Sequence, residues 1–181
     1  MLLDHRASIL LLVDIQEKLM PAMHEPQRVV ANAAILLGAA YRLGAPVIVT
    51  EQYPKGLGHT VPEIAGLIRD RDAVMPKLTF SAAADASTLA RLRQSRRSQV
   101  VIAGVEAHVC VMQSAIGLVQ AGYQVFVTAD ATSARSPRNV ELAMNRLNLN
   151  GVSVVSTEMV LFEWLARAGT DEFRELSRLI R

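Results

Sequence analysis

Short, wholly apolar runs alternate along this chain with stretches in which apolar and polar residues follow a helical spacing. The first apolar run, residues 9–13 (ILLLV), ends at Asp14. Apolar residues then recur between Pro26 and Gly44 with a period of about 3.6, which predicts a helix between that proline and that glycine. Because a continuous apolar run is typical of a strand buried on both faces, residues 9–13 predict a central strand.

The rest of the chain repeats this alternation. Further strands are predicted at residues 47–50, 73–75, 100–103, 125–128 and 152–155, and further helices at residues 84–93, 110–121, 137–148, 158–168 and 171–180. Residues 51–60 (EQYPKGLGHT) have the Pro and Gly content of a loop. Strands that alternate with helices predict a single α/β domain over residues 1–181. The domain would have three layers, α/β/α, and the middle layer would be a mostly parallel, six-stranded, Rossmann-like sheet.

The composition agrees with a globular domain and argues against a partner held by charge. Of the 181 residues, 51% are hydrophobic, which is enough for a sizeable core, and the formal net charge is +2. The one basic cluster, residues 91–97 (RLRQSRR), contains no aromatic residue on which a base would stack. We therefore expect no nucleic-acid partner.

The cellular setting is predicted from the apolar run and the cysteine count. Residues 9–13 are far fewer than the roughly 20 residues that cross a bilayer, and they lack the cleavage pattern of a signal peptide. The chain contains one cysteine, which rules out an internal disulfide. These features favour a cytoplasmic protein without a membrane partner.

Polar residues directly follow several of the predicted strands. Asp14 comes after the first strand, Glu51 after the second and Lys77 after the third, while the segment 104–110 follows the fourth. In an open parallel sheet, the carboxyl ends of the strands meet at one edge, where ligands bind. We therefore expect an acid, a base and the only thiol, Cys110, to converge at that edge.

Cys110 has two interpretations that the spacing alone leaves open. At the start of the helix predicted for residues 110–121, its thiolate would be stabilised by the helix dipole and by the ammonium of Lys77. Asp14 would accept the thiol proton and later pass it to a leaving group. The other interpretation is a buried apolar cysteine on the core face of that helix.

The remaining candidates carry a weaker signal. Tyr53 and Phe80 follow strand ends and would either wall a pocket or serve as ordinary packing. His108, two residues before Cys110, would act as a base, line the pocket or lie at the surface. His59 lacks a further ligand at metal-binding spacing, so we expect no metal site. Neither GxGxxG nor GxxxxGK[ST] occurs, which argues against dinucleotide and nucleotide triphosphate cofactors.

Four motifs resemble those of the isochorismatase-like cysteine hydrolases, a superfamily that includes nicotinamidases and isochorismatase. In chain order they are LVDIQ at residues 12–16, Pro76-Lys77 with Phe80 and Ser81, GVEAHVCV at residues 104–111, and Asp130-Ala131-Thr132 with Ser133 and Arg135. The resemblance extends over residues 8–167 and implies the isochorismatase-like hydrolase fold. The loop EQYPKGLG is similar to that of the isochorismatase domain-containing subgroup.

The resemblance also implies a mechanism. Cys110 would attack a carbonyl carbon, Asp14 would accept its proton, and Lys77 would hold the thiolate and orient Asp14. A small amide or related C–N bond would then be cleaved through a thioacyl-enzyme intermediate. A cis peptide between Val105 and Glu106 would turn the N–H groups of Glu106 and Cys110 toward the oxyanion. The substrate pocket would include Gln52, Tyr53, Phe80 and His108.

The partners follow from the same resemblance. It implies a small-molecule substrate and a homo-oligomer, and no metal or other cofactor, because Glu51, Gln52 and Tyr53 stand where nicotinamidases carry metal ligands. Isochorismatase proper cleaves a vinyl ether without the cysteine, so Cys110 argues against that reaction. Two alternatives stay open: a catalytically idle binding or scaffold subunit, and a hydrolase of esters or vinyl ethers.

Overall fold

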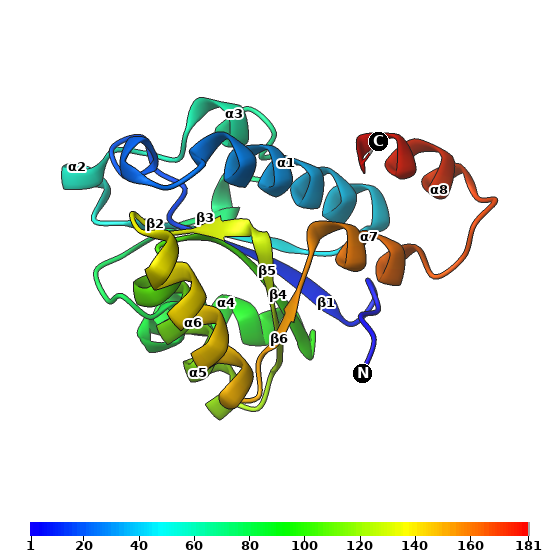
Figure 1. Cartoon of the computed structure of the whole chain (residues 1–181). Helices are drawn as coiled ribbons and strands as arrows, with labels where there is room; N and C mark the ends of the chain where they lie inside the picture. Colours follow the sequence, from blue (N-terminus) through cyan, green and yellow to red (C-terminus); the bar gives the residue numbers. More distant parts are fainter. Residues whose placement is uncertain (181) are drawn as a thin grey trace.

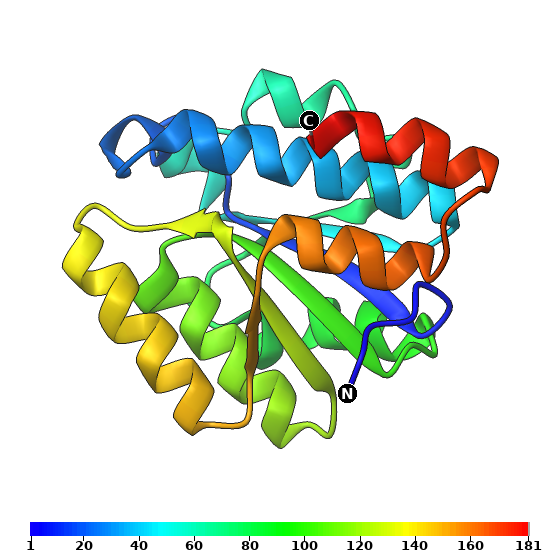
Figure 2. The same cartoon turned by 45° about the vertical axis from the view of Figure 1, so that its right-hand side comes forward.

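Six parallel strands form the centre of the computed structural model, which describes residues 1–180 (Figures 1 and 2). The strands are β1 (Ser8–Val13), β2 (Val47–Gln52), β3 (Val74–Lys77), β4 (Gln99–Val105), β5 (Gln124–Ser133) and β6 (Ser153–Val155). Their order across the sheet is β3-β2-β1-β4-β5-β6, and every neighbouring pair is parallel. The α/β fold class predicted from the alternation is therefore confirmed.

Helices cover both faces of the sheet. The helices are α1 (Pro26–Leu43), α2 (Pro54–Leu57), α3 (Pro62–Ala65), α4 (Ala86–Gln94), α5 (Met112–Gln120), α6 (Pro137–Leu149), α7 (Thr157–Leu165) and α8 (Asp171–Leu176). Figures 1 and 2 show α1, α3, α7 and α8 on one face of the sheet and α4, α5 and α6 on the other. Short 3₁₀ turns lie at Met20–Ala22, Arg71–Ala73, Ala82–Ala84 and Ser177–Ile180, and a π-helical turn lies at Ala107–Val111.

The two faces of β1 explain why its sequence is apolar without interruption. Leu10 and Leu12 pack into the core that also contains Leu36 of α1, whereas Ile9 and Leu11 belong to the core on the opposite face. Successive side chains of a strand point to opposite faces, so a strand covered on both sides needs apolar residues at every position. All six residues of β1 are buried.

Several element boundaries differ from those that the sequence predicts. β3 extends through Pro76 to Lys77, and it tolerates the proline because it is an edge strand. The helix predicted from residue 110 begins at Met112, and Cys110 lies in the preceding π-helical turn. The predicted loop 51–60 begins with the last two residues of β2 and contains the single turn of α2. A helix of four residues is too short to show a period.

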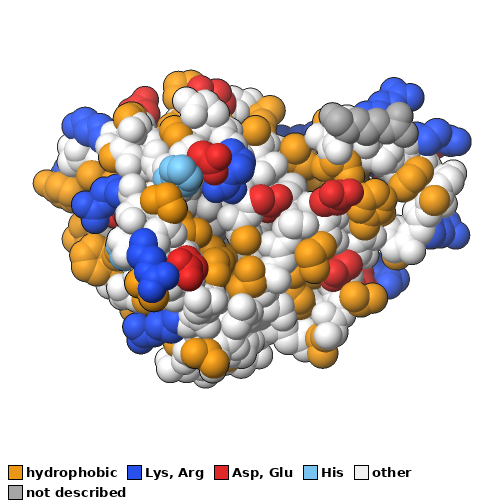
Figure 3. Space-filling model, in the orientation of Figure 1, with side chains coloured by type: hydrophobic (Ala, Val, Ile, Leu, Met, Phe, Trp, Pro, Cys, Tyr) orange, Lys and Arg blue, Asp and Glu red, His pale blue; other side chains and the backbone are white. Residues whose placement is uncertain are grey.

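The surface seen in Figure 3 mixes positive and negative side chains among hydrophobic ones, in keeping with the small net charge of +2. Across residues 1–180, none of the helices combines the length and apolar character that a membrane crossing requires. The cytoplasmic setting itself stays a prediction.

Gly104 lets β4 approach β1 at the strand ends that carry Asp14 and Cys110. Its φ is +127°, and a Cβ there would overlap the carbonyl oxygen of Val13. We expect Gly104→Ala to lower the free energy of unfolding by about 3 kcal/mol or more. The exposed Gly38 in α1 has open space around it, so Gly38→Ala should instead stabilise the protein by up to about 1 kcal/mol. Urea unfolding measures both, and an unchanged midpoint for Gly104→Ala would contradict the close contact.

Candidate active site

The strand order reverses between β1 and β4, and this reversal places two of the candidate residues. Asp14 directly follows β1, and Cys110 lies in the π-helical turn after β4. Lys77 is the last residue of β3, from which its side chain extends to Asp14. In open α/β sheets, ligands bind beyond the carboxyl ends of the strands at such a reversal. The fold therefore gathers Asp14, Lys77 and Cys110 where a ligand site is expected.

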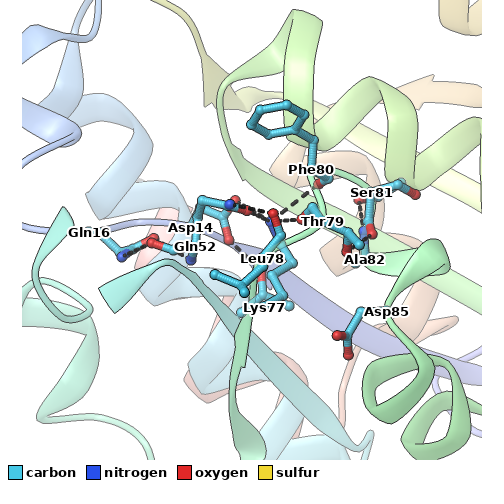
Figure 4. A network of polar contacts seen from close by, with 12 residues as sticks. Asp14, Gln16, Gln52, Lys77, Leu78, Thr79, Phe80, Ser81, Ala82 and Asp85 are labelled. Atoms are coloured by element: carbon cyan, nitrogen blue, oxygen red, sulfur yellow. Dashed lines mark hydrogen bonds and ion pairs between the residues drawn. The ribbon is translucent and has the colours of Figure 1, made fainter. Parts of the chain in front are cut away.

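Asp14 and Lys77 form a fully buried ion pair (Figure 4). Lys77 Nζ lies 2.8 Å from Asp14 Oδ2, and neither side chain is exposed to solvent. The hydroxyl of Thr50 donates to the other carboxylate oxygen, Oδ1, at 2.7 Å. Both oxygens of Asp14 thus have a partner, which fixes the plane of the carboxylate.

Lys77 donates to three further acceptors besides Asp14. Gln52 Oε1 accepts at 2.7 Å, and the carbonyl oxygens of Thr79 and Phe80 accept at 3.2 Å each. Buried charges are costly unless they are paired and hydrogen-bonded, and Lys77 satisfies both conditions.

Cys110 is almost fully buried beside this pair, with 7% of its surface exposed. Burial raises the pKa of its thiol to about 12, and the negative charge of Asp14 adds to this effect, while Lys77 acts against it. Burial also raises the pKa of the Asp14 carboxyl, against the lowering influence of Lys77. Burial and Asp14 thus disfavour the thiolate of Cys110, and burial increases the basicity of the Asp14 carboxylate. Lys77 favours the thiolate, as predicted, but burial and Asp14 act against it more strongly.

The turn before Cys110 has an unusual backbone. The peptide bond between Val105 and Glu106 is cis, at the position that the family resemblance indicates. The carbonyl oxygen of Glu106 accepts from the N–H groups of Val109 and Val111, at 3.0 and 3.2 Å. Within the described residues, the N–H of Cys110 is not among the donors to this carbonyl.

The side chain of Glu106 pairs with Arg135, the residue that follows Ala134 beyond β5. Arg135 Nε lies 2.9 Å from Glu106 Oε2, and the arginine side chain is 64% exposed, against 14% for the glutamate. The Glu106 carboxylate is therefore paired with a solvent-facing guanidinium.

The four residues predicted to line the pocket do not share one surface. Gln52 is buried and contacts Lys77, whereas Tyr53 and Phe80 are 52% and 56% exposed. His108 faces α6, where its Nε2 lies 3.3 Å from Asn139 Nδ2. A cavity of about 510 Å³ beside the cluster is lined by Tyr53 and Lys77. The other three predicted pocket residues, Gln52, Phe80 and His108, do not line this cavity.

Glu51 does not join the cluster, although it also lies at a strand end. Its Oε1 accepts from the N–H and hydroxyl of Thr60, at 2.7 and 2.8 Å, and its Oε2 lies 3.0 Å from His59 Nδ1. Successive residues of β2 face opposite sides, so Glu51 points away from the side chains of Thr50 and Gln52. Glu51 closes the loop that follows β2. Among residues 1–180, His, Cys, Asp and Glu side chains form no group of three or more suited to a metal ion.

Thr50 and Gln16 belong to this region but were not predicted from the sequence. Thr50 is a β-branched residue inside an apolar strand, which gives it no signal beyond strand propensity. Gln16 lies in the LVDIQ motif, and its buried amide bonds to the backbone of Gln52. The LVDIQ motif therefore indicates Gln16 as well as Asp14.

The fold and the cluster define an α/β protein of the cysteine-hydrolase type, with one thiol and a buried acid–lysine pair at the strand reversal. Comparison with known proteins extends this class to a family. The isochorismatase domain model matches residues 8–159, so the chain belongs to the isochorismatase family.

The relatives cover nearly the whole chain. Isochorismatase domain-containing protein 2 of Danio rerio is 37% identical over 180 residues, which cover 98% of this chain and 89% of that protein. A solved structure described as MAR1 ribonuclease from Caenorhabditis elegans is 31% identical, with a TM-score of 0.92, over 99% of this chain and 92% of that one. The YcaC gene product of Escherichia coli, described as an octameric hydrolase of unknown specificity, has the same TM-score at 24% identity, over 98% and 90% of the two chains. That last likeness concerns the fold alone.

Proposed function

We propose that this protein is a cysteine hydrolase that cleaves a small amide or related C–N bond through a thioacyl-enzyme intermediate. The observation that carries the proposal is the buried Asp14–Lys77 pair beside the buried thiol of Cys110. A buried carboxylate of increased basicity, next to a thiol that does not ionise by itself, is the arrangement that general-base activation of a nucleophile requires.

The first half of the reaction forms the thioester. Asp14 accepts the proton of the Cys110 thiol while the sulfur bonds to the substrate's carbonyl carbon. The carbonyl π electrons move onto oxygen, and the N–H groups of Glu106 and Cys110 hold the oxyanion. When the carbonyl re-forms, the C–N bond breaks and Asp14 returns its proton to the leaving nitrogen.

The second half releases the acid. Asp14, again a carboxylate, takes a proton from the attacking water, whose oxygen bonds to the thioester carbon. The carbon–sulfur bond breaks, and the proton returns from Asp14 to the Cys110 sulfur. Lys77 takes no part in these proton transfers, and its ammonium is held by the carboxylate and three neutral acceptors. Its charge stabilises the Asp14 carboxylate and the developing thiolate.

The test is a panel of small amides incubated with the wild-type protein and with Cys110→Ala. We expect ammonia or amine release from at least one amide, and an acyl adduct on Cys110 in the intact-mass spectrum after rapid acid quenching. Since removal of a catalytic nucleophile costs several orders of magnitude, Cys110→Ala should lower turnover by about 10⁴-fold or more. Turnover that persists in Cys110→Ala would refute the thioacyl route.

The alternatives predict other results from the same panel. Cleavage of esters or vinyl ethers without cleavage of amides would indicate a different hydrolysis. No turnover, combined with an unreactive Cys110, would favour a catalytically idle binding subunit. Ribonuclease activity, the description of the Caenorhabditis elegans structure, is disfavoured because the cation of this cluster, Lys77, is buried and cannot meet a phosphate.

Partners and setting also belong to this proposal. We expect a small-molecule substrate, no cofactor, a single domain over residues 1–181 and a homo-oligomer in the cytoplasm. The octamer described for the Escherichia coli protein and the exposed apolar side chains of Tyr53, Leu78 and Phe80 beside the cluster support an assembly of several subunits.

A further inference from the structure

The strand β2 supplies no member of the proposed catalytic group, yet it lies between the strands that carry Asp14 and Lys77. Two of its side chains, two residues apart and therefore on one face, contact one member each. Thr50 bonds to Asp14, and Gln52 bonds to Lys77. We infer that Thr50 and Gln52 are positioning residues that fix the Asp14–Lys77 pair for its action on Cys110, an inference that rests on the proposed function.

Thr50 determines which oxygen of Asp14 faces Lys77. Its hydroxyl holds Oδ1 at 2.7 Å, while Lys77 holds Oδ2 at 2.8 Å. Rotation of the carboxylate about its last bond would break both contacts. The hydroxyl also lowers the pKa of Asp14, against the opposing effect of burial. Thr50 thereby favours the ionised form of Asp14 and fixes the orientation of its carboxylate, with Oδ2 toward Lys77.

Both polar atoms of the Gln52 side chain have partners within the cluster. Its side-chain Nε2 donates to the carbonyl oxygen of Leu78 at 2.9 Å, which leaves Oε1 as the atom that accepts from Lys77 at 2.7 Å. The residue pairs with Lys77 across the β2–β3 ladder. The substrate-pocket role of Gln52 stays a prediction, and the structure adds a contact of its side chain with the Lys77 ammonium.

Gln16 holds the backbone of Gln52 in place beyond the end of the sheet. Its Oε1 accepts from the N–H of Gln52 at 2.7 Å, and its Nε2 donates to the carbonyl oxygens of Gln52 and Gly58, at 3.0 and 2.7 Å. Gln16 is fully buried. Gln16 thus holds both the N–H and the carbonyl oxygen of Gln52, whose side-chain amide contacts Lys77. Such support is expected for a residue that positions a reacting group.

The experiment measures how fast iodoacetamide alkylates Cys110 between acid and alkaline pH, by mass spectrometry on the whole protein. Alkylation joins the sulfur to the reagent's methylene carbon, expels iodide and passes the thiol proton to Asp14, so it requires no substrate. The ionisable groups that face Asp14 are Lys77 and Cys110. Thr50→Val should slow alkylation about tenfold at pH 7 and move its acid limb to higher pH, because the loss of the hydroxyl raises the pKa of Asp14.

The companion variants separate positioning from packing. Thr50→Ser keeps the hydroxyl and should stay within about threefold of the wild type, whereas Gln52→Met keeps the size but removes the acceptor and should slow alkylation about tenfold. Two matched controls are Thr128→Val and Gln99→Met. Both residues are buried, and their polar atoms bond to backbone carbonyls away from the Asp14–Lys77 pair, at Ile102 for Thr128 and at Leu2 for Gln99. The controls should alkylate at the wild-type rate.

Two results would overturn the inference: wild-type alkylation rates in Thr50→Val and Gln52→Met, or an equal loss in Thr50→Ser and in the controls. Failure of the proposed function is a separate result, since it would show as absent amide turnover while the alkylation series still distinguishes the variants. With an amide substrate in hand, Gln52→Met should lower kcat about tenfold and leave KM within about threefold.

Discussion

The Asp14→Asn variant is expected to hydrolyse amides about 10²- to 10⁴-fold more slowly than the wild type at neutral pH, the usual contribution of a positioned general base. Asparagine has the size of aspartate but neither accepts the thiol proton nor returns it to the leaving nitrogen. The buried thiol has a pKa of about 12, so few thiolates form without a base beside it. The measurement is kcat/KM on an amide that the wild type cleaves.

The same variant is expected to change Cys110 in the opposite sense, by lowering the pKa of its thiol. The negative charge of Asp14 is the second cause, after burial, that raises this pKa. In Asp14→Asn that charge is gone, and the ammonium of Lys77 is left to favour the thiolate. Ultraviolet absorbance of the thiolate during a pH titration reads the shift, with Cys110→Ala as the blank because the chain has one cysteine. Undiminished turnover, or a thiol that titrates above the wild type, would show that Asp14 is not the base.

The sheet could be predicted because its strands are buried on both faces. The runs at residues 9–13, 47–50 and 100–103 lie within β1, β2 and β4, and each has the continuous apolar pattern that a doubly covered strand requires. β5 continues to Ser133, past its predicted end at Thr128. The hydrophobic pattern misses this second half because it contains Asp130, Thr132 and Ser133. Polar residues at a strand end conceal the strand from a pattern based on hydrophobicity.

The gathering of Asp14, Lys77 and Cys110 could be predicted because it depends on strand ends. Topology alone brings the carboxyl ends of parallel strands to one edge. The contacts of Thr50, Gln52 and Glu106 could not be predicted, since they depend on side-chain directions and register. Glu51 illustrates the limit: it shares a strand end with Gln52, yet a shift of one residue directs it to the opposite face.

The raised pKa of the Cys110 thiol, which the sequence does not predict, has the same origin. The sequence shows which charges come near Cys110 but not how deeply the sulfur is buried. Burial is the largest influence on the thiol, and it raises the pKa enough to outweigh the nearby ammonium. The proposed reaction therefore depends on Asp14 as the base and on its ion pair with Lys77.

Lys77→Met is expected to remove activity and to destabilise the fold by about 3–5 kcal/mol at neutral pH, because it leaves Asp14 buried without a counter-charge. Methionine has nearly the length of lysine, so the packing volume is kept. Lys77 supplies the largest influence that opposes the burial-raised pKa of Asp14, so that pKa rises further in the variant. Turnover should fall because a higher pKa favours the protonated carboxyl, which cannot accept the thiol proton.

The pH dependence of the stability lost in Lys77→Met tests whether the unpaired charge of Asp14 is its cause. When the pKa of Asp14 is higher in the folded than in the unfolded state, the folded state binds more protons between the two values, and stability falls as pH rises. The stability difference between the wild type and Lys77→Met should therefore be smallest near the ordinary aspartate pKa of 3.8 and grow toward neutral pH. Urea unfolding at several pH values measures it. The double variant Asp14→Asn/Lys77→Met removes both charges and should recover part of the stability lost at neutral pH. A loss that is equal at every pH, and unrelieved in the double variant, would assign the cost to packing and not to the unpaired carboxylate.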